Sequence, residues 1–337
     1  MLALAVLSAA LAADSAAQKQ PARAQGSASA AVQPSLPLLP ASDAVVLVEL
    51  RRLISEELPR AMASDAPRLA AVSADIDAFK AKTGIDPRAF DTLAAGSRFT
   101  ALAGGKTKLT NTVAVARGTF DMAAVVAAGR ASAKGNHREL KHAGKTVHVF
   151  TLNEEVKLFG LLNVRVSDLA VAELDRTTLA VGHPSAVRAA IDAARGQGAL
   201  RASDLAVLTQ PRAASTLVAF GGKVPRAALQ DLEVGSPEIS RSLASIREFY
   251  GALSTTAGGF GMQTTLRTQA AADAKSLGDT IGTLKQLAPL FIGRLSGDRQ
   301  RLAQNAVESL QVSAQGNEVR LSLEIAQGDL TTLVRTF

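Results

Sequence analysis

The chain has 337 residues, of which 47% are hydrophobic and 4% aromatic, and its formal net charge at pH 7 is +7. It contains no cysteine, which excludes disulfides, thiol catalysis and lipid attachment to a cysteine. Trp is absent and Tyr occurs once, so the usual stacking partners of single-stranded nucleic acid are missing and no nucleic-acid partner is expected.

The first residues predict an export signal. Leu2 to Ala13 carries no charge and fits the ~7–15-residue apolar core of a secretory signal peptide, whereas ~20 residues are needed to span a bilayer. Small residues follow it, so we expect a signal peptide over residues 1–17 and a periplasmic or extracellular product. No later uncharged run approaches membrane-spanning length, so a membrane-spanning chain is not expected.

Residues 18–40 are rich in Ala, Ser, Gln and Pro and predict a flexible tether. A first module is predicted over residues 41–200. It opens with a Val-rich buried strand from Ala44 to Leu50, followed by a helix from Asp65 to Lys82 that ends at Gly84. Its other expected elements are a strand from Thr110 to Phe120, a helix from Asp121 to Ser132, a hairpin from His137 to Phe150, strands from Leu169 to Leu174 and from Thr177 to Val181, and a helix from Pro184 to Arg195.

A second module is predicted over residues 201–337, and its elements follow a similar order. They are a strand from Ser215 to Phe220, helices from Pro225 to Leu232 and from Pro237 to Ile246, a hairpin from Phe249 to Thr268, a helix from Ala270 to Phe291, a hairpin from Leu310 to Ile325 and a helix from Asp329 to Arg335. The fold class predicted is therefore α+β, with two related modules of antiparallel strands and hairpins packed with helices, produced by internal duplication.

Four short segments resemble exported or envelope-associated bacterial proteins that have no assigned activity. They are Leu39 to Ala44, Lys82 to Pro87, Val187 to Asp192 and Gln315 to Val319. The resemblance covers most of the chain after the tether and carries no catalytic motif. It implies an exported protein and adds no site residue.

The sharpest candidate site lies on the predicted hairpin of the first module. If Ala143-Gly144 is a two-residue turn, Glu139 lies opposite His148 and His137 shares their face. Two imidazoles and one carboxylate suit zinc or non-haem iron and leave positions open for water. The alternative is that this face is simply the solvated one, because Leu140, Val147 and Val149 give the opposite face a core character.

Almost all of the excess positive charge lies between Ala101 and Phe150, where the only acidic residues are Asp121 and Glu139. Such a cluster predicts either a binding surface for an anionic polymer or a plain solvated face. Its members are Lys106, Lys108, Arg117, Arg130, Lys134, Arg138, Lys141 and Lys145.

No motif of a nucleotide-binding loop, a nucleophile elbow or a glycosidase is present. His183 precedes Pro184 and Ser185, where we expect it to cap a helix rather than to serve as a catalytic base. The function predicted is a non-catalytic binding or interaction protein of the cell envelope, with an envelope protein or an anionic polymer as partner and no cofactor. The alternative is a metal-dependent enzyme built on the two histidines and Glu139.

Overall fold

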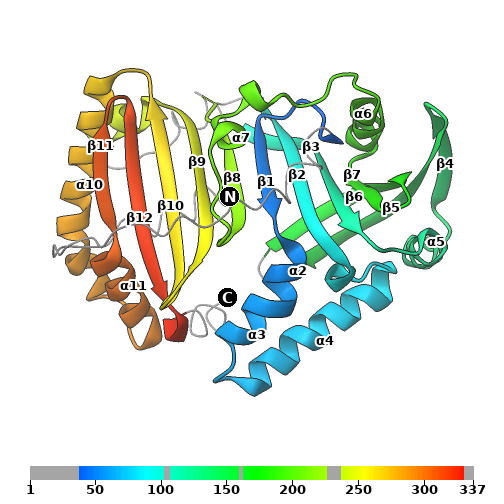
Figure 1. Cartoon of the computed structure of the whole chain (residues 1–337), viewed down its shortest axis with the longest axis horizontal. Helices are drawn as coiled ribbons and strands as arrows, with labels where there is room; N and C mark the ends of the chain where they lie inside the picture. The colour runs from blue at the N-terminus through cyan, green and yellow to red at the C-terminus, as the bar shows by residue number, and fades with distance from the viewer. Residues whose placement is uncertain (1–37, 102–106, 159–161, 226–236, 330–337) are drawn as a thin grey trace. The chain divides into compact units, whose positions relative to one another are not determined.

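The computed structural model describes residues 38–101, 107–158, 162–225 and 237–329 (Figure 1). The predicted signal peptide, most of the predicted tether, the helix expected from Pro225 and nearly all of the last expected helix lie outside these residues. The described chain forms two compact units, of which the first holds residues 38–100 and 109–208 and the second holds residues 209–329.

No helix in the described ranges is both long enough and apolar enough to cross a membrane.

The first unit is built on an antiparallel sheet with the strand order β1-β2-β3-β7-β6-β5-β4. The strands are β1 Ala44–Val48, β2 Phe90–Ala101, β3 Thr107–Gly118, β4 His137–His142, β5 Lys145–Leu158, β6 Leu162–Asp175 and β7 Thr178–Gly182. The helices are α2 Leu50–Arg52, η2 Leu53–Glu57, α3 Leu58–Ala61, α4 Ala66–Thr83, η3 Pro87–Ala89, α5 Met122–Ser132, α6 Pro184–Ala194, η5 Ala202–Asp204 and α7 Ala206–Thr209.

Helices cover both faces of this sheet near β5. On one face, Phe150 and Val171 of the sheet join a buried cluster with Val125 of α5 and Ile76 of α4. On the other face, α6 contacts β5, β6 and β7. Because successive residues of a strand point to opposite faces, the two hydrophobic layers use alternate positions of β5.

The second unit is a smaller antiparallel sheet with the order β11-β12-β10-β9-β8. Its elements are β8 Thr216–Lys223, α9 Pro237–Ala244, β9 Ile246–Thr256, β10 Gly259–Thr268, α10 Ala271–Ile292, α11 Asp298–Ser309, β11 Gln311–Gln315 and β12 Glu318–Ala326. Ala274, Leu277 and Ile281 of α10 are buried against Leu266 of β10 and Val319 of β12. The apolar stripe of α10 is therefore core over this stretch of the helix.

The α+β class predicted from the sequence is what the structure has, and several local predictions are confirmed. Asp65 accepts a hydrogen bond from the Arg68 amide at the start of α4, and Gly84 ends that helix in the left-handed conformation with φ +70°. Asp121 accepts from the Ala123 and Ala124 amides at the start of α5. Capping side chains and glycine mark helix ends because they satisfy backbone groups that have no partner within the helix.

Strand β2, helix α11 and the short helices η3, η5 and α7 were not predicted, and several boundaries were misplaced, among them the end of β5 and the start of β6. In β2 the buried positions hold Phe90, Thr92, Ala94 and Gly96, so the alternation that marks a strand is hidden by small and polar residues. In α11 only Val307 is fully buried, and the segment is too polar to show a helical stripe. The tether was expected to reach Pro40, but Leu39 is fully buried because its carbonyl accepts from Leu200 and the chain bridges there to residue 199.

The two units have a similar order and pairing of strands. In the first, β1, β2 and β3 are followed later by the hairpin β6–β7, whose second strand pairs with β3. In the second, β8, β9 and β10 are followed by the hairpin β11–β12, whose second strand pairs with β10. Helices lie between the third strand and that hairpin in both units, α5 in the first and α10 and α11 in the second, and the first unit has β4 and β5 as extra strands there. This common order supports internal duplication, which stays a prediction.

Candidate metal centre

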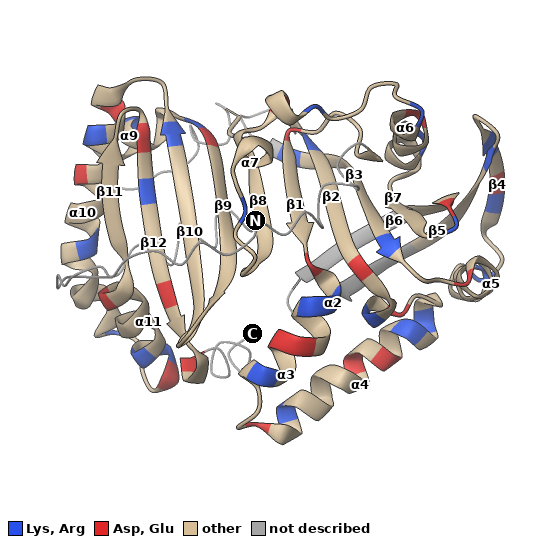
Figure 2. Cartoon of the chain, in the orientation of Figure 1, with Lys and Arg blue, Asp and Glu red and all other residues tan. Residues whose placement is uncertain are grey.

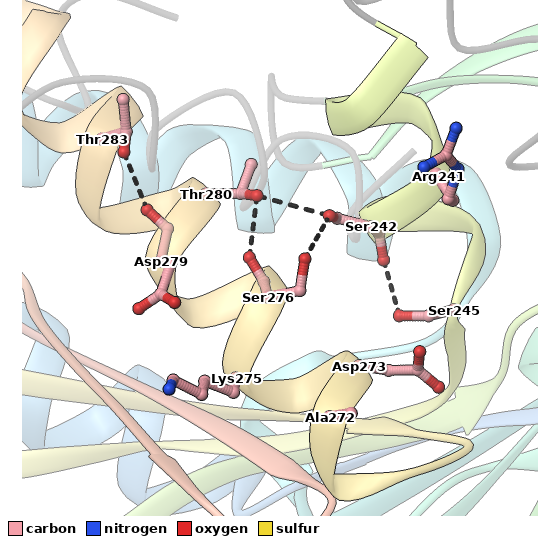
Figure 3. Close-up of a pocket in the computed structure, with 10 residues that line it drawn as sticks. All are labelled: Arg241, Ser242, Ser245, Ala272, Asp273, Lys275, Ser276, Asp279, Thr280 and Thr283. Carbon is pink, nitrogen blue, oxygen red and sulfur yellow. Dashed lines mark hydrogen bonds between the residues drawn. The ribbon is translucent and has the colours of Figure 1, made fainter.

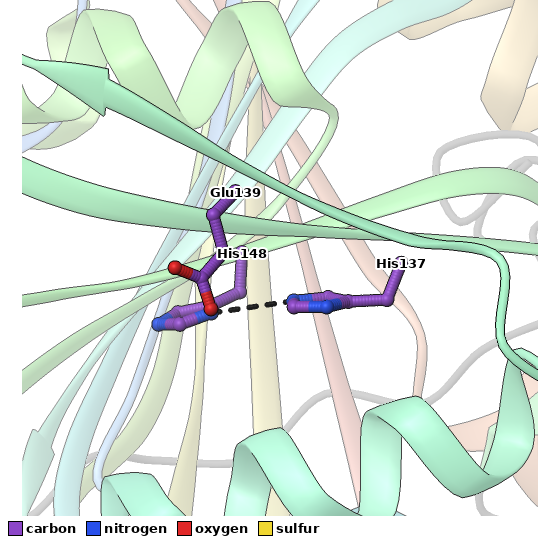
Figure 4. Close-up of side chains that lie close together, drawn as sticks. All are labelled: His137, Glu139 and His148. Atoms are coloured by element: carbon purple, nitrogen blue, oxygen red, sulfur yellow. Dashed lines mark hydrogen bonds and ion pairs between the residues drawn. The ribbon is translucent and has the colours of Figure 1, made fainter.

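The hairpin β4–β5 brings the predicted histidine and glutamate side chains together (Figure 4). Ala143 and Gly144 form its turn with φ +49° and +81°, the pair of positive values typical of a two-residue hairpin turn. This turn sets Glu139 opposite His148 and His137 opposite Phe150. The register expected from the sequence is confirmed, and with it the shared face of the three side chains.

Two distances within this set are compatible with a metal site. His137 Nε2 lies 3.4 Å from His148 Nδ1, and the same His148 nitrogen lies 3.4 Å from Glu139 Oε1. One ligand atom from each residue lies within 4.8 Å of the others. A tetrahedral zinc ion with bonds of ~2.0–2.1 Å spaces its ligand atoms by about 3.3–3.4 Å, so both short separations equal one edge of such a tetrahedron.

Helix α5 packs beside this face of the hairpin and shields part of it, while Glu139 stays 45% exposed. Phe150 stacks on the His137 ring with a centroid separation of 5.0 Å and is itself buried. Gly129 of α5 allows the helix to approach, since a Cβ there would lie 2.5 Å from Phe150 Cζ. The side chain of His148 retains 14% of its exposure. His148 is thus largely shielded on this face, whereas Glu139 is 45% exposed, so the choice between a metal site and a solvated face stays open.

Arg130 of α5 contacts two members of the set. Its Nε donates to His137 Nδ1 at 3.3 Å, and its Nη2 donates to Glu139 Oε1 at 3.0 Å. An accepting Nδ1 places the His137 proton on Nε2, which then donates to His148 Nδ1. In this state the site is closed by hydrogen bonds, and a metal ion must displace both Arg130 and the Nε2 proton.

Breaking the Arg130–Glu139 ion pair costs little free energy compared with what metal binding would supply. Both side chains of the Arg130–Glu139 pair are about half exposed, and exposed ion pairs contribute ~0–1 kcal/mol. Binding at a Kd of ~1 μM supplies about 8 kcal/mol. The ion pair would thus compete with a metal ion for Glu139 without preventing its binding.

The protonation state of His148 favours ligation. Burial lowers the pKa of His148 below its ordinary value of 6.5, and it outweighs the nearby Glu139, which acts in the opposite direction. The positive charge of Arg130 adds to the lowering. His148 is therefore neutral at pH 7, and neutral imidazole is the form that binds metals.

The basic residues do not gather on one surface (Figure 2). Lys106 lies outside the described residues, and Lys108 and Arg117 belong to β3, which β7 and β6 separate from the hairpin. Arg138 points to the hairpin face opposite to that of Arg130 and pairs with Asp168 at 2.7 Å. The remaining members are Lys134 after α5, Lys141 on β4 and Lys145 on β5. The cluster seen in the sequence is thus spread over two faces and several strands.

Asp168 is an ion-pair partner of Arg138 that the sequence analysis did not identify. The Thr151 hydroxyl and the Arg138 guanidinium both donate to it, and together they hold the pKa of Asp168 below its ordinary value. No local signal links Asp168 to Arg138, since the two are thirty residues apart in the chain. The contact cancels one of the charges on which the polyanion prediction depends.

His183 caps α6, as expected. The amide of Ser185 donates to His183 Nδ1 at 3.4 Å, and the Ser185 hydroxyl lies 2.7 Å from the same nitrogen. The Ser185 hydroxyl also lies 3.0 Å from Asn111 Oδ1. The contacts between His183 and Ser185 describe a cap, and the contact to Asn111 links the helix start to β3.

A cavity of about 530 Å³ lies between α9 and α10 in the second unit, and no sequence pattern announced it (Figure 3). Hydroxyl groups dominate its wall and bond to one another: Ser242 Oγ lies 3.2 Å from Ser276 Oγ, and Thr280 donates to Ser242. The full lining is Arg241, Ser242, Ser245, Ala272, Asp273, Lys275, Ser276, Asp279, Thr280 and Thr283. The bonded hydroxyls join the two helices and leave no arrangement typical of catalysis.

No protein-family model matches this chain, and comparison with curated proteins found no match. Among solved structures the chain is similar to crystal forms III, I and IV of TP0453, each at 11% identity. Form III covers 92% of this chain and 100% of its own with a TM-score of 0.44, form I covers 91% and 98% with 0.41, and form IV covers 90% and 97% with 0.42. The likeness extends to neither a function nor a site residue.

Proposed function

We propose that this chain is an exported, non-catalytic binding protein of the cell envelope and that its first unit binds a divalent transition-metal ion. The ion is held by His137, Glu139 and His148. The observation that carries the proposal is the convergence of one ligand atom from each residue within 4.8 Å. Export is supported by the uncharged apolar segment from Leu2 to Ala13.

The ligand set favours zinc over harder ions. Two imidazole nitrogens and one carboxylate oxygen suit Zn²⁺, Cu²⁺ or Fe²⁺, whereas Mg²⁺ and Ca²⁺ prefer sites built from oxygen alone. The 3.4 Å spacings equal the edge of a zinc tetrahedron. Zinc is therefore the ion with which the site is best tested first.

The test is calorimetric titration of the metal-free protein with Zn²⁺ at pH 7.5. We expect one ion per chain and at least a tenfold loss of affinity in Glu139→Gln and in His148→Ala. The matched control is His142→Ala, because His142 lies on the same strand but on the other face, where its ring bonds Asp192 at 2.8 Å. Wild-type protein that binds no zinc, or an equal loss in all three variants, would contradict the proposal.

A second candidate function is metal-dependent hydrolysis. It is favoured by the ligand count, because catalytic zinc sites use three protein ligands and leave the fourth position to water. Zinc-loaded protein would then hydrolyse an activated ester, and a chelator or His148→Ala would abolish the activity. Zinc binding without such activity would leave the binding function alone.

A further inference from the structure

The end of α10 exposes an apolar stripe. Of the five large hydrophobic side chains that are exposed in the described part of the chain, four lie within nine residues. Their exposed fractions are 44% for Leu287, 69% for Leu290, 59% for Phe291 and 42% for Leu295. These four side chains are called the α10 tip below. Contiguous apolar exposure of this kind marks a contact surface more often than a chance arrangement.

The stripe is held in place by the helix beneath it. Positions 287, 290 and 291 are three and four residues apart, so their side chains share one face of α10. Ala288 and Ile292 on another face are buried against Val307 of α11. The backbone continues in helical turns past Gly293, and the Leu295 amide donates to the Ile292 carbonyl. Leu287, Leu290 and Phe291 are therefore presented by a helix that packs on α11, and Leu295 lies three residues beyond its end.

The charges around the tip are mostly positive. The Arg294 guanidinium lies 6.0 Å from the centre of the Phe291 ring. Arg299 and Arg301 follow at the start of α11, and the one acidic residue of this stretch, Asp298, pairs with Arg301 at 3.2 Å. An apolar stripe bordered by arginines is complementary to a surface with a hydrocarbon interior and negatively charged head groups.

The size of the tip argues against a stable protein partner. Four partly exposed side chains present only a few hundred Å², whereas a stable protein interface takes about 800 Å² from each partner. A membrane surface has no such requirement, because a few inserted apolar side chains and a few cations act together there.

We propose that the α10 tip binds the surface of an anionic phospholipid membrane, with Leu290 and Phe291 inserted at the head-group boundary and the neighbouring arginines on lipid phosphates. This inference does not depend on the metal site, which lies in the other unit. It also gives the exported chain a means of staying at the envelope that needs no membrane-spanning helix.

The test is flotation of the full chain with vesicles of phosphatidylcholine containing one fifth phosphatidylglycerol, beside vesicles of phosphatidylcholine alone. We expect binding to the anionic vesicles and at least a tenfold weaker binding by the double variant Leu290→Ser with Phe291→Ser. Leu109→Ser is the control, since Leu109 of β3 is 48% exposed but belongs to the other unit, and we expect it to bind like the wild type. Circular dichroism confirms that all variants fold.

Three results would overturn the proposal. The first is equal flotation of the wild type and the double variant with anionic vesicles. The second is binding that high salt abolishes and that the double variant leaves unchanged, because charge alone would then explain it. The third is a concentration-dependent dimer that the double variant dissociates, which would make the tip an interface between two copies of the chain.

Discussion

Replacing Arg130 with methionine tests the candidate metal centre, because Arg130 would compete with a metal ion for His137 and Glu139. In the wild type a metal ion must break two contacts of Arg130, the 3.0 Å ion pair with Glu139 and the 3.3 Å hydrogen bond to His137. In Arg130→Met both ligands start without that partner, while the side chain keeps a similar length. The variant is therefore expected to bind zinc more tightly, although it removes a residue from the site.

The size of the gain follows from the two contacts. An exposed ion pair contributes up to ~1 kcal/mol, and a hydrogen bond contributes ~0.5–1.5 kcal/mol. Their sum of about 0.5–2.5 kcal/mol corresponds to a roughly 2–60-fold lower Kd, at about tenfold per 1.4 kcal/mol. The assay is competition with a fluorescent zinc chelator at pH 7.5. Arg138→Met is the control, because Arg138 lies on the other hairpin face and pairs with Asp168.

The reasoning would be refuted by an unchanged or weaker zinc affinity in Arg130→Met. A similar gain in Arg138→Met would also refute it, because it would reduce the effect to one of net charge. Raising the salt concentration separates these cases further, since screening weakens a diffuse charge effect more than a displaced contact.

Three more predictions rest on single features of the structure. Burial lowers the pKa of His148 below 6.5, so the contribution of neutral His148 to the free energy of unfolding is complete above pH 6.5 and is lost as the pH falls through the folded-state pKa. In urea titrations between pH 8 and 5, the free energies of unfolding of the wild type and His148→Gln should therefore converge at the acid end. Gly129→Ala should destabilise the fold by about 1–3 kcal/mol, because its Cβ would meet the Phe150 ring at 2.5 Å. Gly282→Ala in α10 should instead stabilise the fold by ~0.5–1 kcal/mol, because a Cβ there meets nothing within 4 Å. Thermal unfolding of both variants checks the opposite signs. Retention on an anionic polymer column should be weak and lost at moderate salt, because the basic residues are spread over two faces, and retention that resists salt would contradict this.

The geometry of the candidate metal centre follows from rules that act within a short segment of the chain. A two-residue turn at Ala143-Gly144 determines the hairpin register, and the register alone brings His137, Glu139 and His148 to one face. Likewise, Asp65 and Gly84 mark the ends of α4 through bonds made within a few residues. These features were predicted correctly because their causes lie within the segment itself.

Other features were decided only by packing between distant segments. Strand β2 hides its alternation behind Thr92, Ala94 and Gly96, which are buried because neighbouring strands and helices cover them. Helix α11 has too few apolar residues to be recognised by its own pattern.

The sequence by itself determined the α+β class, the main hairpins, the helix caps and the membership of the histidine and glutamate set. Only the tertiary structure decided that α5 packs beside this set, that Arg130 contacts two of its members and that the basic residues separate. It also decided that the end of α10 exposes a second apolar face beside its buried stripe. The physical reason is that turns, caps and register depend on neighbours in the chain. Burial and charge pairing depend instead on which remote surfaces meet, and no local pattern encodes that.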